Sequence, residues 1–273
     1  MCVNRKARRV LIWSLLLSLV AALVAARVVA WRFDVRIARD VERVVASPPL
    51  AGERVALPPL LDAFVARAGT PGGSGTRWFR VTQQGEMRLQ PGEDWRAFTA
   101  EQVYAVSEPA FVWHADFGAF RVVDQVVDGV GRLEARVFGV LPVARADGAE
   151  ATRAQLLRYL AELVWVPRAF SDNRSIRWRQ AGPGELVATL AHAGHEVELR
   201  FTFDEAGDVC RVEGVRECGV EGHRGSRPWV GRFSDYRQVG GVRVPTRGEV
   251  EWRLDSGPFV YWRGAIVGLQ AGP

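Results

Sequence analysis

The stretch EVELRFTF, residues 196–203, alternates polar and apolar side chains without a break. Val197, Leu199, Phe201 and Phe203 share one face of an extended chain, and the Glu, Arg and Thr residues between them share the other. Alternation with a period of two is typical of a strand in an antiparallel sheet that is buried on one face and solvated on the other. The stretch therefore predicts a sheet with one covered face.

Turn signals extend this sheet in both directions. Asp-Gly at residues 128–129 and Gly-Gly at residues 240–241 each separate two short apolar runs, and residues 204–208 turn the quoted strand back. Such pairs supply the positive φ angles that tight hairpins need. Residues 83–85 also predict a hairpin. We expect the sheet domain to occupy residues 76–273.

Two helices interrupt this strand pattern. Residues 99–102, Thr-Ala-Glu-Gln, form a capping box and predict a short helix that ends near Pro109. Asp147 and Glu150 precede residues 151–165, where apolar side chains recur at helical spacing. The order of helices, strands, one long internal helix and more strands predicts an α+β fold with a large antiparallel sheet.

The N-terminal segment is the most apolar part of the chain. Residues 10–26 carry no charge and follow a basic segment at residues 1–9. A helix needs about 20 apolar residues to cross the hydrocarbon layer. Trp13 and Trp31 lie where interfacial aromatic residues are expected. Residues 10–31 are therefore predicted to form a transmembrane helix that anchors the protein in the membrane.

Two alternatives to a retained anchor remain open. Small residues at 24–26 and 28–30 are typical of signal-peptide cleavage sites, and a buried core helix has a similar composition. Retention is favoured because the apolar run is longer than the usual hydrophobic region of a signal peptide.

The flanks of the apolar segment predict an orientation. The four positive charges before Val10 favour a cytoplasmic N-terminus, although five arginines follow the segment within residues 27–43. A long domain can be translocated regardless of its charge. We therefore expect a single-pass protein with an extracytoplasmic domain. Residues 32–75 would form a helical connector, with a helix at residues 58–68, and a flexible linker at residues 70–75.

The charge of the chain excludes one class of partner. The formal net charge is +5, but beyond the first nine residues the chain has 32 Lys+Arg against 31 Asp+Glu. A nucleic-acid-binding protein needs a concentrated basic face, and none is visible in the sequence. We predict no nucleic-acid partner.

The cysteines leave two interpretations open. Cys210 and Cys218 flank seven residues of an expected strand-turn-strand, where a disulfide can form outside the cytoplasm, and two free thiols are equally compatible with the sequence. The chain lacks the convergent ligands that a metal site needs, so neither a metal nor another cofactor is predicted.

Polar pairs give weak support to an enzyme. His114 and Asp116 would share one face of a strand, and Asp235 with Tyr236 could project into a cavity. A hydrolase would need a nucleophile or a substrate beside such a pair. Ordinary strand polarity explains the first pair, the second pair can brace the end of a sheet, and no catalytic residue is assigned.

Several segments together resemble an uncharacterised bacterial family, a domain of unknown function that often follows one N-terminal hydrophobic segment. The resemblance covers residues 76–269 and implies no activity. The segments are QGEMR (84–88), FTAEQ (98–102), RYLAE (158–162) with Trp165 and Pro167, FTF (201–203), RPWVGRFSDYR (227–237) and VPTRGE (244–249).

A second resemblance is architectural. The strand-rich order with one long internal helix is similar to the half-barrels of periplasmic lipoprotein carriers and receptors. That resemblance implies a curved sheet wrapped around helices, with an apolar concavity that holds acyl chains. Fold analogy alone does not confer function.

Tryptophan is the residue type that most favours a pocket. Eight of the ten tryptophans lie beyond the linker, and their large apolar rings suit either a core or a pocket wall. With the internal helix as a lid, Trp113, Trp165, Trp229 and Tyr236 are the first candidates for that wall. We expect non-catalytic binding of a lipid or another hydrophobic ligand at a bacterial cell membrane. The alternatives are an extracytoplasmic protein-interaction module and, less favoured, a hydrolase.

Overall fold

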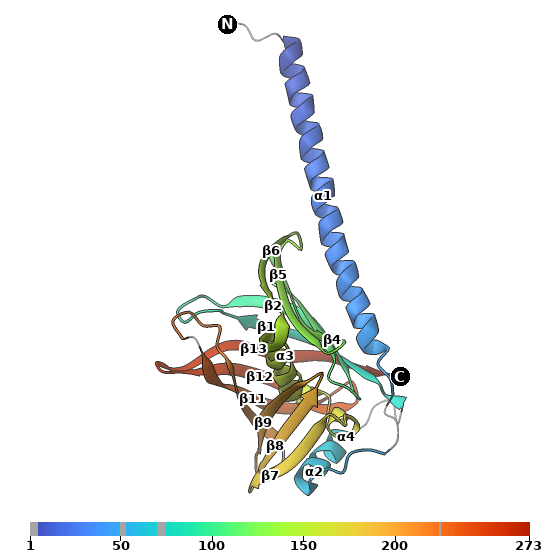
Figure 1. The fold of residues 1–273 in the computed structure, drawn as a ribbon, viewed down its shortest axis with the longest axis vertical. Helices are drawn as coiled ribbons and strands as arrows, with labels where there is room; N and C mark the ends of the chain where they lie inside the picture. The colour runs from blue at the N-terminus through green and yellow to red at the C-terminus, as the bar shows by residue number, and fades with distance from the viewer. Residues whose placement is uncertain (1–4, 50–52, 70–74, 224) are drawn as a thin grey trace.

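A thirteen-stranded antiparallel sheet makes up most of the protein (Figure 1). The computed structural model describes residues 5–49, 53–69, 75–223 and 225–273. The first half of the sheet contains β1 (Trp78–Met87), β2 (Arg96–Ala105), β3 (Phe111–Asp116), β4 (Phe120–Val127), β5 (Val130–Val137) and β6 (Leu141–Ala146). The second half contains β7 (Ile176–Gly182), β8 (Glu185–His192), β9 (His195–Phe203), β10 (Val209–Glu217), β11 (Ser226–Val239), β12 (Val242–Leu254) and β13 (Gly257–Gly272).

The two halves are meanders that meet at the pairing of β1 with β13. Strands β6 and β7 are therefore the two edges of the sheet, although they are consecutive strands in the sequence. The chain between them must return from one edge to the other. It does so through α3 (Gly148–Glu162), a 3₁₀ turn (Leu163–Trp165) and α4 (Ala169–Asp172).

Helix α3 lies inside the curve of the sheet, which wraps around it as a half-barrel (Figure 1). Most of its turns are buried, including Leu156, Leu160 and Ala161. At its N-terminal end the backbone of β5 approaches closely: the N–H of Gly131 donates to the hydroxyl of Thr152 at 3.0 Å. The predicted α+β fold with a large curved antiparallel sheet and one long internal helix is confirmed.

Helix α1 (Arg5–Val45) is a single unbroken helix of 41 residues. Its most apolar 18-residue window has a mean hydropathy of 2.2, and none of that window is buried. Among the described residues, it is the one helix long and apolar enough to cross a membrane. Composition and length of this kind fit an anchor or a signal sequence alike.

The C-terminal half of α1 packs against the convex face of the sheet. Phe33 and Val44 are buried against residues of β2, β3 and β4, including Val103 and Val112. Buried Asp40 accepts a hydrogen bond from the Nε2 of Gln125 at 3.0 Å. Residues 33–45 thus continue α1 without a break and dock on the sheet.

Helix α2 (Pro59–Ala68) begins with proline and ends before Gly69, as the sequence predicts. Its Phe64 side chain makes ring contacts with Phe170, Phe203 and Tyr236 at centroid distances of 6.0–6.2 Å. The linker predicted at residues 70–75 lies almost entirely outside the described residues.

The short helix predicted at residues 99–109 is wrong, because this segment lies in β2 and the turn that follows it. Phe98 and Ala100 are buried on the concave side, and Gln102 takes the next inward position of the same alternating series. The Gln102 amide is bonded to side chains in the core rather than to a helix N-terminus. Burial of alternate residues outweighed the local capping signal.

The hairpin predicted at residues 83–85 is also wrong, because β1 runs through this segment without a break. Gly85 serves close packing instead of a turn. A Cβ added there would lie 2.4 Å from the carbonyl oxygen of Arg263 and 2.8 Å from the Phe98 ring. The hairpins at residues 128–129 and 240–241 are confirmed.

Candidate functional site

A cavity of about 550 Å³ lies between α3 and the concave face of the sheet. The helix contributes Ala151, Ala154 and Ala161, whose small side chains leave space above the strands. The floor contains Gly231 of β11 and Gly248 of β12. Small residues on both sides therefore keep the helix and the sheet apart without closing the space between them.

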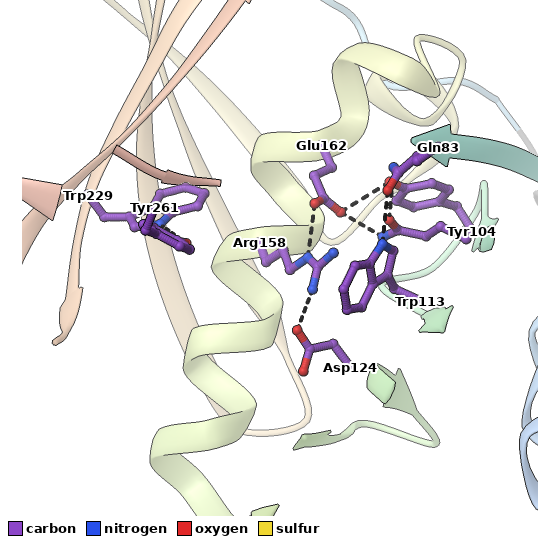
Figure 2. A network of polar contacts seen from close by, with 9 residues as sticks. Gln83, Tyr104, Trp113, Asp124, Arg158, Glu162, Trp229 and Tyr261 are labelled. Atoms are coloured by element: carbon purple, nitrogen blue, oxygen red, sulfur yellow. Dashed lines mark hydrogen bonds and ion pairs between the residues drawn. The ribbon is translucent and has the colours of Figure 1, made fainter. Parts of the chain in front are cut away.

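Aromatic side chains form much of the cavity wall. Trp165, Trp229, Trp252, Tyr261 and Trp262 all line it. The indole N–H of Trp229 donates to the hydroxyl of Tyr261 at 2.9 Å (Figure 2), and that of Trp165 donates to the carbonyl of Pro245 at 3.1 Å. Because these polar atoms are already paired, the rings present apolar surface to the cavity.

A charged network extends from α3 on the side away from Trp229 in the view of Figure 2, and its Asp124, Arg158 and Glu162 also line the cavity. Arg158 of α3 donates from Nε to Glu162 at 2.9 Å and from Nη1 to Asp124 of β4. Glu162 also accepts hydrogen bonds from Gln102 at 2.6 Å and from Tyr104 at 3.1 Å. The network joins α3 to the first half of the sheet.

Trp113 and Gln83 complete this network. The indole N–H of Trp113 donates to Gln83 Oε1 at 2.9 Å, and Gln83 Nε2 donates to Gln102 at 3.4 Å. The Arg158 guanidinium lies 4.6 Å from the Trp113 ring centroid. A buried arginine is thus compensated by two carboxylates and an aromatic face.

Burial changes the acidity of these groups. Burial raises the pKa of Asp124 above its usual 3.8, although Arg158 and Arg216 act in the opposite direction. Burial and the neighbouring Glu162 carboxylate raise the pKa of the Tyr104 hydroxyl well above 10.0. Tyr104 therefore stays protonated and acts as a hydrogen-bond donor to Glu162.

Three polar side chains that line the cavity keep buried atoms without hydrogen-bond partners: Asp124 Oδ1, Gln155 Oε1 and Arg216 Nε. The Arg216 guanidinium lies 5.5 Å from the Trp229 ring and 5.6 Å from the Trp252 ring. Buried polar atoms are seldom left unpaired, because each costs about 1–3 kcal/mol. These atoms give an otherwise largely apolar cavity a polar end.

The structure separates the four wall candidates named from the sequence. Trp165 and Trp229 line the cavity. Trp113 is fully buried behind Arg158 and does not reach the cavity. Tyr236 packs against Phe64 at the far end of the sheet, and its hydroxyl donates to the Val209 carbonyl at 2.7 Å. Trp165 and Trp229 are thus wall residues, Trp113 is a core residue, and Tyr236 is a partly buried residue that packs against the core.

Sequence reasoning missed the polar residues of the cavity. Gln155, Arg158 and Glu162 recur at helical spacing on α3, next to its apolar face. Such a polar stripe within a mostly buried helix is the signal that could have found them. Asp124 and Arg216 sit on separate strands, and nothing local marks them.

The disulfide alternative for Cys210 and Cys218 is not realised, and both are free thiols. Cys210 lies in β10, and Cys218 directly follows the last residue of that strand. Eight residues of extended chain span about 26 Å. The expected strand-turn-strand is therefore a single strand, which keeps the two sulfur atoms apart.

The histidine and aspartate pairs lie away from the cavity. His114 and Asp116 are on β3 beneath α1, where burial lowers the pKa of His114, and Asp116 accepts the N–H of Gly118 at 2.6 Å. Asp235 pairs with Arg237 at 2.8 Å. Within the described ranges, no group of three or more His, Cys, Asp or Glu residues is placed to hold a metal.

Apolar side chains, carboxylates, amides and arginines line the cavity. Among the described residues that line it, there is no serine, threonine, cysteine, histidine or lysine. The remaining hydroxyl, that of Tyr261, accepts a hydrogen bond from Trp229, and burial raises its pKa. The cavity can surround an apolar group and bind a polar one at one end.

Comparison with known proteins gives a family and a loose structural likeness. The model of a family of unknown function, DUF6544, matches residues 51–264. No curated protein matches this chain. The sequence-based expectation of a domain of unknown function is thereby confirmed.

Three solved structures are similar in fold. A LolA superfamily protein from Nitrosomonas europaea has 10% identity and a TM-score of 0.42, covering 78% of this chain and 94% of that one. A DUF1329 family protein from Desulfovibrio piger has 10% identity and a TM-score of 0.39, with coverages of 78% and 90%. A domain from Vibrio parahaemolyticus, described as an outer membrane lipoprotein-sorting protein, has 11% identity and a TM-score of 0.37, with coverages of 78% and 90%.

Proposed function

Since the chain belongs to DUF6544, a family of unknown function, we propose a function from its own geometry. The protein binds a lipid chain or a similar hydrophobic group in the cavity under α3, without chemical conversion. Helix α1 holds it in a bacterial cell membrane, with the sheet domain on the extracytoplasmic side.

The cavity itself is the observation that carries this proposal. Its volume of about 550 Å³ falls within the range of roughly 300–1,000 Å³ that is usual for small-ligand pockets. Its wall combines tryptophan rings with small residues on α3, so an apolar chain would contact aromatic faces on one side and helix backbone on the other. Such a surface gains free energy by excluding water from the ligand.

The polar end of the cavity supports a ligand with a polar group. The unpartnered oxygens of Asp124 and Gln155 are both hydrogen-bond acceptors. They would accept hydrogen bonds from a hydroxyl or an amide N–H of the ligand, and the unpartnered Arg216 Nε would donate one to a ligand oxygen. The proposed ligand is therefore amphipathic, with a polar group near these three side chains.

Helix α1 supports the location. Its exposed apolar segment and the basic residues that precede it fit an anchor with a cytoplasmic N-terminus. A tethered domain meets a membrane-derived ligand at a high effective concentration, because both are confined to the same surface.

Photochemical labelling tests the proposal on the full chain. The protein is reconstituted in nanodiscs of phosphatidylethanolamine and phosphatidylglycerol that contain a fatty acid with a diazirine group near its end. After irradiation, adducts are mapped by mass spectrometry. We expect adducts on β11 and β12 at the cavity floor, in addition to those on α1. Adducts confined to α1 would exclude acyl-chain binding in the cavity.

A matched pair of variants makes this test specific. Ala154→Phe places a ring in the cavity, whereas Ala149→Phe adds the same ring at an exposed position of the same helix. The first change should remove the adducts on β11 and β12, and the second should retain them. Native mass spectrometry of the detergent-extracted protein, followed by lipid analysis, would then identify the natural occupant.

A further inference from the structure

The β5–β6 hairpin exposes a cluster of large apolar side chains. Phe138 at its turn is 67% exposed, and Leu141 and Val143 of β6 are 61% and 51% exposed. Single exposed apolar residues are common on protein surfaces. Three such residues within six positions of one hairpin form a patch, which we call the hairpin tip (residues 138–143).

The hairpin tip lies beside α1 at the end of its exposed apolar segment. Gly139 lies beside the helix, where an added Cβ would make an ordinary contact with the Cβ of Ala30 at 3.5 Å. The next residue of the helix, Trp31, is exposed. Figure 1 shows this hairpin as the part of the sheet that extends furthest along α1 towards the N-terminus.

The hairpin is fixed to the helix. Arg36 of α1 forms an ion pair with Glu134 of β5 at 2.5 Å. Phe33 of α1 is buried against the sheet, and the guanidinium groups of Arg36 and Arg136 lie 5.1 Å and 4.8 Å from its ring centroid. The height of the hairpin tip along α1 is therefore set by these contacts.

The backbone of the turn keeps Phe138 in an unfavourable conformation. Phe138 has a φ of 49° and is followed by Gly139 with a φ of 71°. Positive φ is rare for a bulky side chain, and strain of this kind persists where the surroundings impose it. Here it holds an aromatic ring in solvent instead of in the core.

We propose that the hairpin tip enters the headgroup region of the same lipid bilayer that holds α1. This inference rests on the anchoring role given to α1 above. When residues 10–31 span the hydrocarbon layer, Ala30 lies at its boundary, and the hairpin tip beside Ala30 lies at the same depth. Aromatic and aliphatic side chains are favoured at this depth. The contact would fix the tilt of the sheet as well as its distance from the membrane.

The test places a fluorescent probe at Leu141 in the full chain and leaves Phe138 intact. Cys2 and Cys210 are replaced by serine, and Leu141→Cys is labelled with nitrobenzoxadiazole. The protein is reconstituted in vesicles of phosphatidylethanolamine and phosphatidylglycerol that carry spin-labelled lipids as quenchers. Val215→Cys is the matched control, because Val215 on β10 is 65% exposed. Leu17→Cys reports on α1.

We expect the lipid quenchers to quench the probes at 17 and 141 and to leave the probe at 215 bright. Adding Phe138→Ser should reduce the quenching at 141. A quenched probe at 17 with probes at 141 and 215 that behave alike would overturn the hairpin contact and leave the anchor in place. An unquenched probe at 17 would overturn the anchor and the contact together. Protection of 141 from aqueous iodide without lipid quenching would indicate a protein partner and also overturn the contact.

Discussion

The guanidinium of Arg158 lies 4.6 Å from the ring centroid of Trp113 and binds Asp124 and Glu162 on its edges. Arg158 is on the helix that crosses the concave face, and Trp113 and Asp124 are on neighbouring strands of the sheet. One cation therefore joins three separate elements. The position of α3 above the cavity depends on it.

Replacing Arg158 by methionine should destabilise the protein by about 3–5 kcal/mol, because two largely buried carboxylates lose their cation. Asp124 already has a raised pKa, and the loss of Arg158 raises it further. A carboxyl whose folded pKa is raised costs stability when it is ionised. The difference in stability between the wild-type protein and Arg158→Met should therefore shrink as the pH falls towards the pKa of Asp124. Thermal unfolding in detergent micelles measures this difference.

Arg153→Met is the matched control for this prediction, because Arg153 is exposed on the same helix. Arg153→Met should change the free energy of unfolding by no more than about 0.5 kcal/mol. Equal effects of the two substitutions, or a deficit for Arg158→Met that does not change with pH, would contradict the role given to the network.

Gly131→Ala should push α3 away from β5. The added Cβ would lie 2.4 Å from the Cα of Thr152 and 2.9 Å from the carbonyl oxygen of Ala151, both of which are backbone atoms. Overpacking of this kind costs about 1–3 kcal/mol. Gly219→Ala meets no atom within 4 Å and should leave the unfolding temperature unchanged. An unchanged unfolding temperature for Gly131→Ala would contradict this prediction and show that α3 can shift freely.

Asp208→Asn should destabilise the protein by about 1.5–3 kcal/mol at neutral pH, because Asp208 accepts charged hydrogen bonds from two arginines. Arg243 donates two, at 2.6 Å each, and Arg67 donates one at 3.5 Å, and these contacts hold the pKa of Asp208 below its usual 3.8. A carboxyl with a lowered folded pKa stabilises the protein above its unfolded pKa, and this contribution is lost as the pH falls through the folded value.

The stability gap between the wild-type protein and Asp208→Asn should therefore be constant between about pH 7 and pH 5 and narrow below about pH 4. Unfolding temperatures of both proteins across this range measure the gap. A gap that narrows already near neutral pH would mean that another group is titrating.

The thiols offer a simple chemical test of the second half of the sheet. Alkylation of the denatured protein without prior reduction should label both Cys210 and Cys218, because they lie at opposite ends of β10 as free thiols. Mass spectrometry of the peptides measures the labelling. Labelling that appears after reduction alone would mean that the two residues are bonded and that the strand register differs.

Local signals predicted the parts of the fold that local interactions determine. The hairpin at residues 128–129 follows from an Asp-Gly pair with φ values of 52° and 75°. The glycine at position 85 looks the same in the sequence, but its role is to let the Phe98 ring and the β13 backbone come close. That contact joins segments that are far apart along the chain, so no short window of sequence contains it.

Local sequence signals also predicted only part of the cavity. Trp165 and Trp229 could be named as wall residues because large aromatic side chains are few and conspicuous. Trp113 has the same composition signal, but it is fully buried and its ring faces Arg158 instead of the cavity. Asp124 of β4 and Arg216 of β10 line the same cavity, although six strands lie between them in the order of the sheet. The curvature of the sheet brings them together, and no short window of sequence contains that curvature.

The unbroken course of α1 determines the reach of this protein. Whatever surface holds its apolar end also sets the height and heading of the half-barrel, since there is no hinge between Arg5 and Val45 and Phe33 and Val44 are locked to the strands. Because the helix is rigid, the cavity stays at one distance and in one orientation relative to that surface. A partner that delivers the proposed ligand or removes it must therefore come to the cavity, because the cavity cannot move out to meet it.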